Sequence, residues 1–208
     1  MTTGFWIILL AILVYGLAHS WLASLDVKER ARRRFGSAAS RWFRLVYNLV
    51  AALTLLPVLL LPVVLIDRPI YTIRLPWLVL TVLLQLMAVA ALLIGLAQTG
   101  FWSFLGISQA LTGSDEQPTR LVVTGLYRWV RHPLYTAGLV FIWLMPVMTW
   151  NLLAINLGAT IYIVIGAFFE ERKLLREYGE AYAAYRQSTP MLIPGIKAIR
   201  KLFRKKPK

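Results

Sequence analysis

Four long apolar stretches dominate the 208-residue sequence and restrict what the chain can fold into. A transmembrane helix needs roughly 20 consecutive apolar residues to cross a hydrocarbon core of about 30 Å. The first three stretches have about this length, whereas the fourth is about twice as long. Pro146 and Thr149-Trp150-Asn151 interrupt the fourth, and we interpret the Trp-Asn pair as a tight turn between two shorter helices. The stretches are Gly4 to Ser24, Leu45 to Ile66, Pro76 to Gln98 and Leu134 to Phe169.

The pattern predicts an all-α polytopic membrane protein with five transmembrane helices, of which the last two form a helical hairpin. The composition agrees, because 59% hydrophobic and 15% charged residues make the chain far more apolar than a soluble domain. The first stretch lacks a basic flank and a small-residue cleavage site, so we expect a retained helix rather than a signal peptide. We expect one membrane domain over residues 1–208, with a motif-bearing part at 124–194 and a basic tail at 195–208.

The basic residues predict the orientation, because Lys and Arg near the ends of crossings stay on the cytoplasmic side. Five crossings place all but two of the 23 Lys and Arg residues on one side, the exceptions being Arg68 and Arg74. The sequence thus predicts an outside N-terminus and a cytoplasmic C-terminal segment. We also expect the membrane to be a prokaryotic inner (plasma) membrane. The net charge of +14 follows from this asymmetry and the tail. It indicates a lipid bilayer as partner, and no nucleic acid.

The basic tail GIKAIRKLFRKKPK has two interpretations. Its apolar residues recur at helical spacing between basic ones, which suits a short helix lying on an anionic leaflet. A disordered basic end is the alternative. The chain contains no cysteine, so it has no disulfide, thiolate metal site or cysteine nucleophile.

The sequence RHPLYTAG, residues 131–138, stands where a polar segment meets an apolar one. Pro133 suits the first position of a helix, with His132 near the N-cap. A helix N-terminus carries free N–H groups and partial positive charge, so together with Arg131 it favours an anion such as a carboxylate. In the alternative, Arg131 extends to a lipid phosphate and His132 only caps the helix.

Two adjacent acids, Glu170 and Glu171, follow the long apolar run. Adjacent helical residues point about 100° apart, and only Lys173 offers a local partner, so we expect their partners elsewhere in the chain. The predicted hairpin returns both acids to the neighbourhood of Arg131 and His132. An anion site beside a cation site suits a zwitterion. The alternative is a pair of solvated acids at the membrane interface.

The sequences TGLYRWVRHPLYTAG (residues 124–138) and EERKLLREYGEAYAAYRQSTPMLIP (residues 170–194) together resemble a family of membrane methyltransferases. It is typified by isoprenylcysteine carboxyl methyltransferase and the phospholipid N-methyltransferases, which use S-adenosylmethionine. HSWLAS (residues 19–24), RLVYNLVA (residues 44–51) and WLMPVMT (residues 143–149) are similar to the branch that contains methanethiol S-methyltransferase and NnrU-like proteins. Isoprenylcysteine enzymes carry arginines shortly before the paired acids, whereas residues 165–169 are uncharged here.

The resemblance implies a pocket for S-adenosyl-L-methionine. In it, Arg131 and His132 would meet the carboxylate, an acid would meet the ammonium group or the ribose hydroxyls, and Tyr135 would face the sulfonium. The cofactor-binding residues that it implies are Gly125, Tyr127, Arg131, His132, Pro133, Tyr135, Glu170 and Glu171.

Other residues carry more open expectations. Arg131 and His132 are the candidate catalytic residues, and His132 is either a cofactor ligand or a base for a thiol. His19, near the inner end of the first crossing, is either a packing residue or a substrate-side residue. Tyr182 and Tyr185 either close the pocket or pack at the interface. The two histidines of the chain do not make a convincing zinc or haem site, although a bis-histidine site is the remaining alternative.

The implied function is an S-adenosylmethionine-dependent methyltransferase acting on a small or lipophilic acceptor, with a thiol as the first choice. One alternative is an NnrU-like non-catalytic membrane protein of nitrogen-oxide metabolism. Another is a methyltransferase that acts on a prenylcysteine carboxylate or a phospholipid amine.

The predicted topology can be tested by cysteine labelling, because the native chain has no cysteine. We expect a cysteine at Ser37 or Ser114 to react with an impermeant thiol reagent only after the cell is opened. A cysteine at Thr72 should react from outside intact cells. Labelling of Thr72→Cys only from inside would contradict the five-crossing topology.

Overall fold

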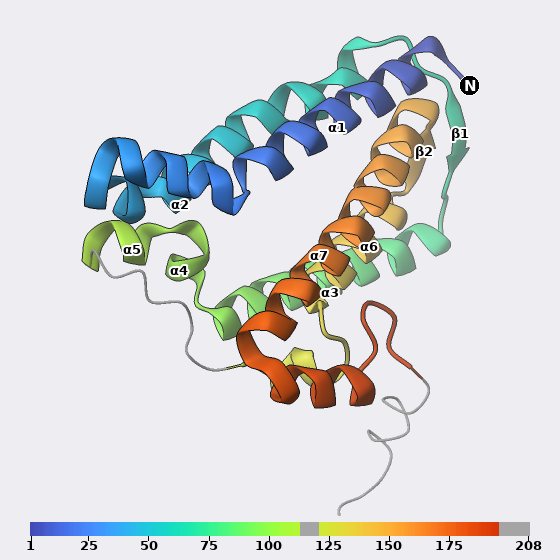
Figure 1. The fold of residues 1–208 in the computed structure, drawn as a ribbon. Coiled ribbons are helices and arrows are strands. Elements are labelled where there is room, and N and C mark those ends of the chain that lie inside the picture. Colours follow the sequence, from blue (N-terminus) through green and yellow to red (C-terminus); the bar gives the residue numbers. More distant parts are fainter. Residues whose placement is uncertain (113–120, 196–208) are drawn as a thin grey trace, which may run out of the picture. The chain divides into compact units, whose positions relative to one another are not determined.

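A computed structural model describes residues 1–112 and 121–195 of the chain, and this part is mostly helical (Figure 1). In chain order the elements are α1 (Thr3–Leu22), α2 (Leu25–Val64), β1 (Pro69–Thr72), α3 (Trp77–Thr99), α4 (Phe101–Leu105), α5 (Ile107–Thr112), the 3₁₀ helix η1 (Gly125–Arg128), α6 (Pro133–Trp143), β2 (Val147–Thr149) and α7 (Trp150–Ser188).

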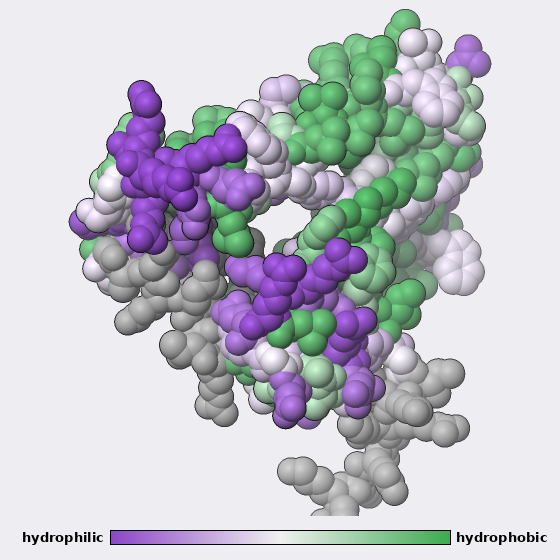
Figure 2. All heavy atoms as spheres, in the orientation of Figure 1, coloured by the Kyte–Doolittle hydropathy of each residue, from purple (hydrophilic) through white to green (hydrophobic). Residues whose placement is uncertain are grey.

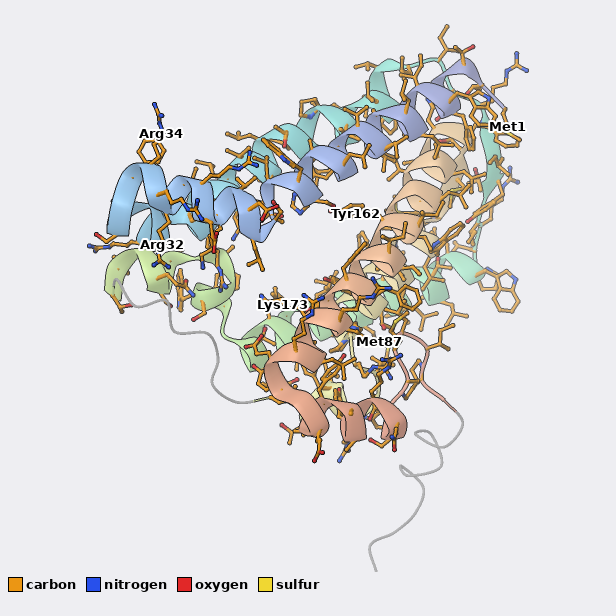
Figure 3. All side chains as sticks on the ribbon, in the orientation of Figure 1. Met1, Arg32, Arg34, Met87, Tyr162 and Lys173 are labelled. Carbon is orange, nitrogen blue, oxygen red and sulfur yellow. The ribbon has the colours of Figure 1, made fainter. Side chains whose placement is uncertain are left out.

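Within the described ranges, four helices are long and apolar enough to cross a membrane: α1, the Arg41–Val64 part of α2, α3 and α7. Their outward side chains are apolar, as Leu10, Val63 and Leu86 illustrate. Figure 2 shows hydrophobic side chains covering much of α1 and α2. Helix α2 bends at Gly36, and hydrophilic side chains gather on its part before the bend, where Arg32 and Arg34 lie (Figure 3). An apolar outer surface of this extent suits lipid, so the chain is an integral membrane protein.

The fifth predicted crossing is not confirmed. Helix α6 has 11 residues, which is a length of about 16 Å, well short of the roughly 30 Å hydrocarbon core. The predicted return of the chain is confirmed, because the Tyr135 hydroxyl in the first turn of α6 donates a hydrogen bond to Glu170 of α7. Five crossings and the orientation of the termini stay predictions.

The predicted turn at Trp150-Asn151 is wrong, because both residues are helical and α7 begins at Trp150. The break between the helices lies at residues 144–149. Thr149 explains the shift, since its hydroxyl accepts a hydrogen bond from the Leu152 N–H and so caps the helix. β2 lies within the break and pairs antiparallel with β1, with Thr72 opposite Val147 and Pro69 opposite Thr149. We did not predict this ribbon from the sequence.

The structure describes the connection between α3 and α6 at residues 100–112 and 121–132. It contains the short helices α4 and α5, and later η1. Arg41 of α2 donates a hydrogen bond to the Ala110 carbonyl, and Arg44 donates one to the Ser103 carbonyl. These bonds satisfy backbone carbonyls that have no partner within such short helices. Ser114, Arg120 and the predicted tail helix lie outside the described residues.

The described chain divides into two compact units, and α7 runs from one into the other. Unit 1 comprises residues 1–75, 100–117 and 146–162, and unit 2 comprises residues 76–99, 118–145 and 163–208. The single membrane domain expected from the sequence stays a prediction.

The core of unit 1 joins the starts of α1 and α7. Phe5, Ile8 and Ala154 form a buried apolar cluster there. Asn151, which is fully buried, accepts a hydrogen bond from the Thr2 hydroxyl at 3.0 Å and donates to the carbonyls of residues 65 and 66 at 3.3 and 3.4 Å. One polar side chain thus ties α1 and the end of α2 to α7.

In unit 2, α3 and α6 pack together, and Gln98 at the end of α3 holds η1. Its Oε1 atom accepts a hydrogen bond from the Leu126 N–H at 3.3 Å. Gly125 has a positive φ of 62°, and a Cβ there would collide with the Gln98 amide. The position therefore requires glycine, both for its backbone conformation and for the close approach of Gln98.

Replacing Asn151 with leucine should lower the free energy of unfolding by about 1–3 kcal/mol, because buried carbonyls and the Thr2 hydroxyl lose their partner. The measurement is reversible unfolding in mixed detergent micelles. Thr54→Val is the control, because this exposed hydroxyl bonds only within its own helix in the structure, and we expect less than about 0.5 kcal/mol there. Equal stability of the two variants would contradict the role of Asn151.

Candidate active site

The candidate site in unit 2 begins where α6 begins. Pro133 occupies the first helical turn and His132 the N-cap, without a capping hydrogen bond from its side chain. The chain after α7 runs along this start: the N–H groups of Arg131 and His132 donate to the carbonyls of Pro190 and Met191, at 2.9 and 3.1 Å. The Thr136 hydroxyl donates to the Leu192 carbonyl at 2.6 Å. The two sequence motifs are therefore joined by backbone as well as by side chains.

Arg131 and Glu171 form a buried ion pair. The Nε and Nη2 atoms of Arg131 each lie 2.6 Å from Glu171 Oε1, and the two side chains are only 9% and 5% exposed. The Nη1 atom donates to the carbonyls of Arg186 and Thr189. The guanidinium is thus engaged by one carboxylate and by the end of α7, as a buried charge requires. This arrangement does not support an Arg131 that extends to lipid phosphate.

His132 lies between the two carboxylates. Its Nδ1 is 3.5 Å from Glu170 Oε2, and its Nε2 is 3.4 Å from Glu171 Oε1. The second approach is close, but its geometry forms no hydrogen bond, and Nε2 has no hydrogen-bond partner among the described residues. The imidazole stacks on the Tyr135 ring, with centroids 5.3 Å apart and an angle of 14°. The Tyr135 hydroxyl donates to Glu170 Oε2 at 2.8 Å.

The two adjacent acids have different surroundings, as their directions on the helix require. Glu171 is 5% exposed, and Arg186 Nε lies 3.5 Å from its Oε2 atom as a second cation. Glu170 is 44% exposed, accepts a hydrogen bond from the Tyr135 hydroxyl and lies 3.5 Å from the imidazole. The interpretation as two solvated acids therefore fails for Glu171, whereas Glu170 keeps an open side.

Three tyrosines lie near these charged residues, one on η1 and two on the last segment of α7. The Tyr185 hydroxyl donates to the Tyr127 carbonyl. The Tyr182 side chain is 1% exposed, and its hydroxyl has no hydrogen-bond partner among the described residues. Burial, with a smaller contribution from nearby Glu170, raises the pKa of the Tyr127 phenol to about 12. Tyr127 is thus a neutral hydroxyl across the physiological pH range.

The structure brings most of the predicted site residues together. Five form one cluster, and Tyr127 lies close enough to it for the Glu170 charge to act on its phenol. The expectation that Glu170 and Glu171 find distant partners near Arg131 and His132 is confirmed. The clustered residues are Arg131, His132, Tyr135, Glu170 and Glu171, with Pro133 beside them and Gly125 at the start of η1.

His19 lies in unit 1, among Tyr15, Tyr47 and Tyr162. Its substrate-side role stays a prediction. Sequence reasoning missed the carbonyls of Arg186 and of residues 189–192, which hold Arg131 and the start of α6. The signal was the sequence STPMLIP, since two prolines after a helix favour an extended segment with free carbonyl groups.

Residues 79–181 match the phospholipid methyltransferase family. The chain is 31% identical over 188 residues to methanethiol S-methyltransferase of Pseudomonas sp. (strain GM41(2012)), which covers 88% of this chain and 70% of that protein. It is 38% identical over 93 residues to methanethiol S-methyltransferase 1 of Bradyrhizobium diazoefficiens, and 46% identical over 69 residues to the enzyme of Mycobacterium tuberculosis. No solved structure matches the chain.

The matches differ in extent. The Bradyrhizobium match covers 45% of this chain and 33% of that protein, and the Mycobacterium match covers 33% and 28%. The fold and the matched region define an integral membrane protein with a domain of the phospholipid methyltransferase type. The Pseudomonas relative extends the likeness to most of the chain, which belongs to the methanethiol S-methyltransferase branch of that family.

Replacing Glu171 with glutamine should lower the free energy of unfolding by about 3–5 kcal/mol, because Arg131 would remain buried without its counter-ion. Unfolding in mixed detergent micelles measures this loss. Glu177→Gln makes the same change at an exposed position of the same helix, so we expect less than about 0.5 kcal/mol. Similar stabilities of the two variants would show that the pair contributes little.

Proposed function

We propose that the protein is an S-adenosylmethionine-dependent integral membrane methyltransferase that acts on a small or lipophilic thiol. The observation that carries the proposal is the position of His132 between two carboxylates of unequal exposure, beside the ion-paired Arg131. A charged cluster of this kind in an apolar chain is a candidate functional site. Family membership supports methyl transfer as its purpose.

The side chains of the cluster fit the cofactor. S-adenosylmethionine carries a carboxylate, an ammonium group, ribose hydroxyls and a sulfonium. The half-exposed Glu170 carboxylate suits the ammonium group or the ribose hydroxyls. His132 Nε2 and the Tyr182 hydroxyl are buried polar atoms with unused hydrogen-bonding capacity, which suits the cofactor carboxylate. The Tyr135 ring supplies a π face for the sulfonium.

Arg131 has a different role in this proposal. Its donors are engaged by Glu171 and by carbonyls at the end of α7, so it is a positioning residue that holds the site together. His132 is then the residue that contacts the cofactor carboxylate directly. Gly125 and Pro133 shape the backbone around them, and Tyr127 offers a neutral phenol.

When bound, S-adenosylmethionine supplies an electrophilic methyl group on a sulfonium. The residues of the chain then hold the reacting partners in line and exclude water, which lowers the barrier without covalent catalysis. The pairing of charges in a dry site strengthens each contact.

The name of the relatives supports a thiol acceptor. Residues 165–169 before the acids are uncharged, and Ile165, Phe168 and Phe169 are exposed apolar side chains. Such surroundings disfavour a large polar acceptor or a carboxylate, because burying an unpaired polar group costs a few kcal/mol. The family match by residues 79–181 makes the amine of a phospholipid the second candidate acceptor. The alternative function is that of an NnrU-like protein without catalytic activity, which would need the fold but no cofactor site.

The cellular setting is part of the proposal. The distribution of Lys and Arg supports five crossings, with α6 as the short fifth helix, an outside N-terminus and a cytoplasmic C-terminus. The bacterial relatives support a prokaryotic inner membrane, and a single membrane domain over residues 1–208 is part of the same proposal.

Purified protein with labelled S-adenosylmethionine tests the function against alkanethiols, prenylcysteines and phosphatidylethanolamine. We expect label in the thiols, and binding of S-adenosylmethionine and S-adenosylhomocysteine in isothermal titration. Label only in the phospholipid or the prenylcysteine would refute the thiol acceptor. Binding of neither cofactor form would favour the non-catalytic alternative.

Replacing Glu170 with glutamine should weaken the binding of S-adenosylmethionine by about tenfold, because a charge-assisted contact is lost from a half-exposed group. Titration in detergent gives this number, and thermal unfolding should stay close to that of the wild type. Glu177→Gln is again the matched control and should bind normally. An unchanged affinity of Glu170→Gln would remove this residue from the cofactor site.

A further inference from the structure

The part of α2 before its bend, residues 25–35, is a strongly basic segment of unit 1, which we call the α2 arm. All of its arginines are exposed, and hydrophilic side chains cover much of it (Figures 2 and 3). The ion pair of Arg33 with Glu29, at 3.5 Å, is itself 81% and 67% exposed, so water screens it. The arm carries five basic and two acidic residues, which are Lys28, Arg30, Arg32, Arg33 and Arg34, with Asp26 and Glu29.

The arm is tied at both ends to membrane-spanning helices of the same unit. Helix α1 ends at Leu22, and Ser24 caps the arm by accepting a hydrogen bond from the Val27 N–H. After the bend at Gly36, the next apolar span begins at Arg41. A helix of the length of the arm reaches only about 16 Å. Because both of its ends lie within a few residues of a span, the arm lies along the membrane surface and cannot stand far out from it.

Large apolar side chains at both ends of the arm suit this position. Trp21 and Leu25 at one end are 61% and 72% exposed, and Phe35 and Trp42 at the other are 64% and 46% exposed. The Arg34 guanidinium lies over the Phe35 ring, 5.9 Å from its centroid. Such side chains are favourable where they enter the boundary between headgroups and acyl chains. The arm thus combines apolar anchors with arginines at the level of the headgroups.

Two other basic segments near the ends of spans differ from the arm. Residues 170–186 of α7 carry four basic and four acidic residues, so their charges cancel. Arg41 and Arg44, which follow the bend of α2, donate hydrogen bonds to backbone carbonyls of α5 and α4. Of these three segments, only the arm presents an excess of exposed positive charge that is not committed to the fold.

We propose that the α2 arm is a binding surface for the headgroups of anionic phospholipids. The planar guanidinium group donates two parallel hydrogen bonds to phosphate oxygens and keeps its charge at every physiological pH. The position of the arm keeps its arginines within a Debye length of the headgroups, which is roughly 8 Å at physiological salt. Because the arm is separate from the candidate site, this inference does not rest on the proposed function.

Energy transfer from tryptophan to labelled lipid tests the preference. Full-length protein is reconstituted in phosphatidylcholine vesicles with a trace of pyrene-labelled phosphatidylglycerol or phosphatidylcholine in both leaflets. We expect the wild type to prefer phosphatidylglycerol by about fivefold, as one basic residue near one lipid charge provides. The preference should disappear in about 1 M salt, where the Debye length is roughly 3 Å. Arg32→Gln/Arg33→Gln/Arg34→Gln should lower it to about twofold or less, the remainder coming from the basic tail.

Two matched variants separate the charge of the arm from its shape and from the total charge. Arg32→Lys/Arg33→Lys/Arg34→Lys keeps the charge of the arm and should keep most of the preference. Arg172→Gln/Lys173→Gln/Arg176→Gln removes as much charge from exposed positions of α7 and should keep the wild-type preference. A wild type that does not distinguish the two lipids would overturn the proposal. An unchanged preference in the glutamine variant of the arm, or an equal loss in either matched variant, would overturn it as well.

Discussion

The candidate site depends on one buried pair of opposite charges, Arg131 and Glu171. Removing two charges from water is costly, and the pair is stable only if every remaining donor and acceptor is satisfied. Glu171 forms ion pairs with Arg131 and Arg186, while the Arg131 guanidinium also donates hydrogen bonds to two carbonyls at the end of α7. The pair thereby fixes the start of α6 against α7 and against residues 190–192. His132 is held between the two acids as a consequence.

A bend in α7 makes these contacts geometrically possible. The helix changes direction at Gly179, whose φ of 54° and ψ of −127° are accessible mainly to glycine (Figure 1). The segment after the bend carries Tyr182, Tyr185 and Arg186 toward the site. Before the bend, the roughly 100° between adjacent helical residues separates the acids, so that one is buried and structural while the other stays open to a ligand. One short motif thus supplies a buried structural carboxylate and an exposed one.

Much of this site could be predicted from the sequence, because a charged side chain beside an apolar run needs a partner and few residues of the chain can provide one. Paired acids without local partners indicated Arg131 and His132, and Pro133 indicated the start of a helix. The start of α7 could not be predicted, because the capping role of Thr149 depends on the break in the chain at residues 144–149. The β1–β2 ribbon and the carbonyls that hold Arg131 depend on backbone contacts between residues far apart in sequence, for which side-chain patterns carry little signal. The shortness of α6 was hidden because the apolar run continues beyond it.

A double-mutant cycle tests most directly whether the Arg131–Glu171 pair organises the site. The free energy of unfolding in mixed detergent micelles is measured for the wild type, Arg131→Met, Glu171→Leu and the double variant. We expect each single variant to be strongly destabilised by its unpaired buried charge, and the double variant to recover much of that loss, with a coupling energy of at least about 2 kcal/mol. Single losses that add to within about 0.5 kcal/mol would contradict a site built on this pair.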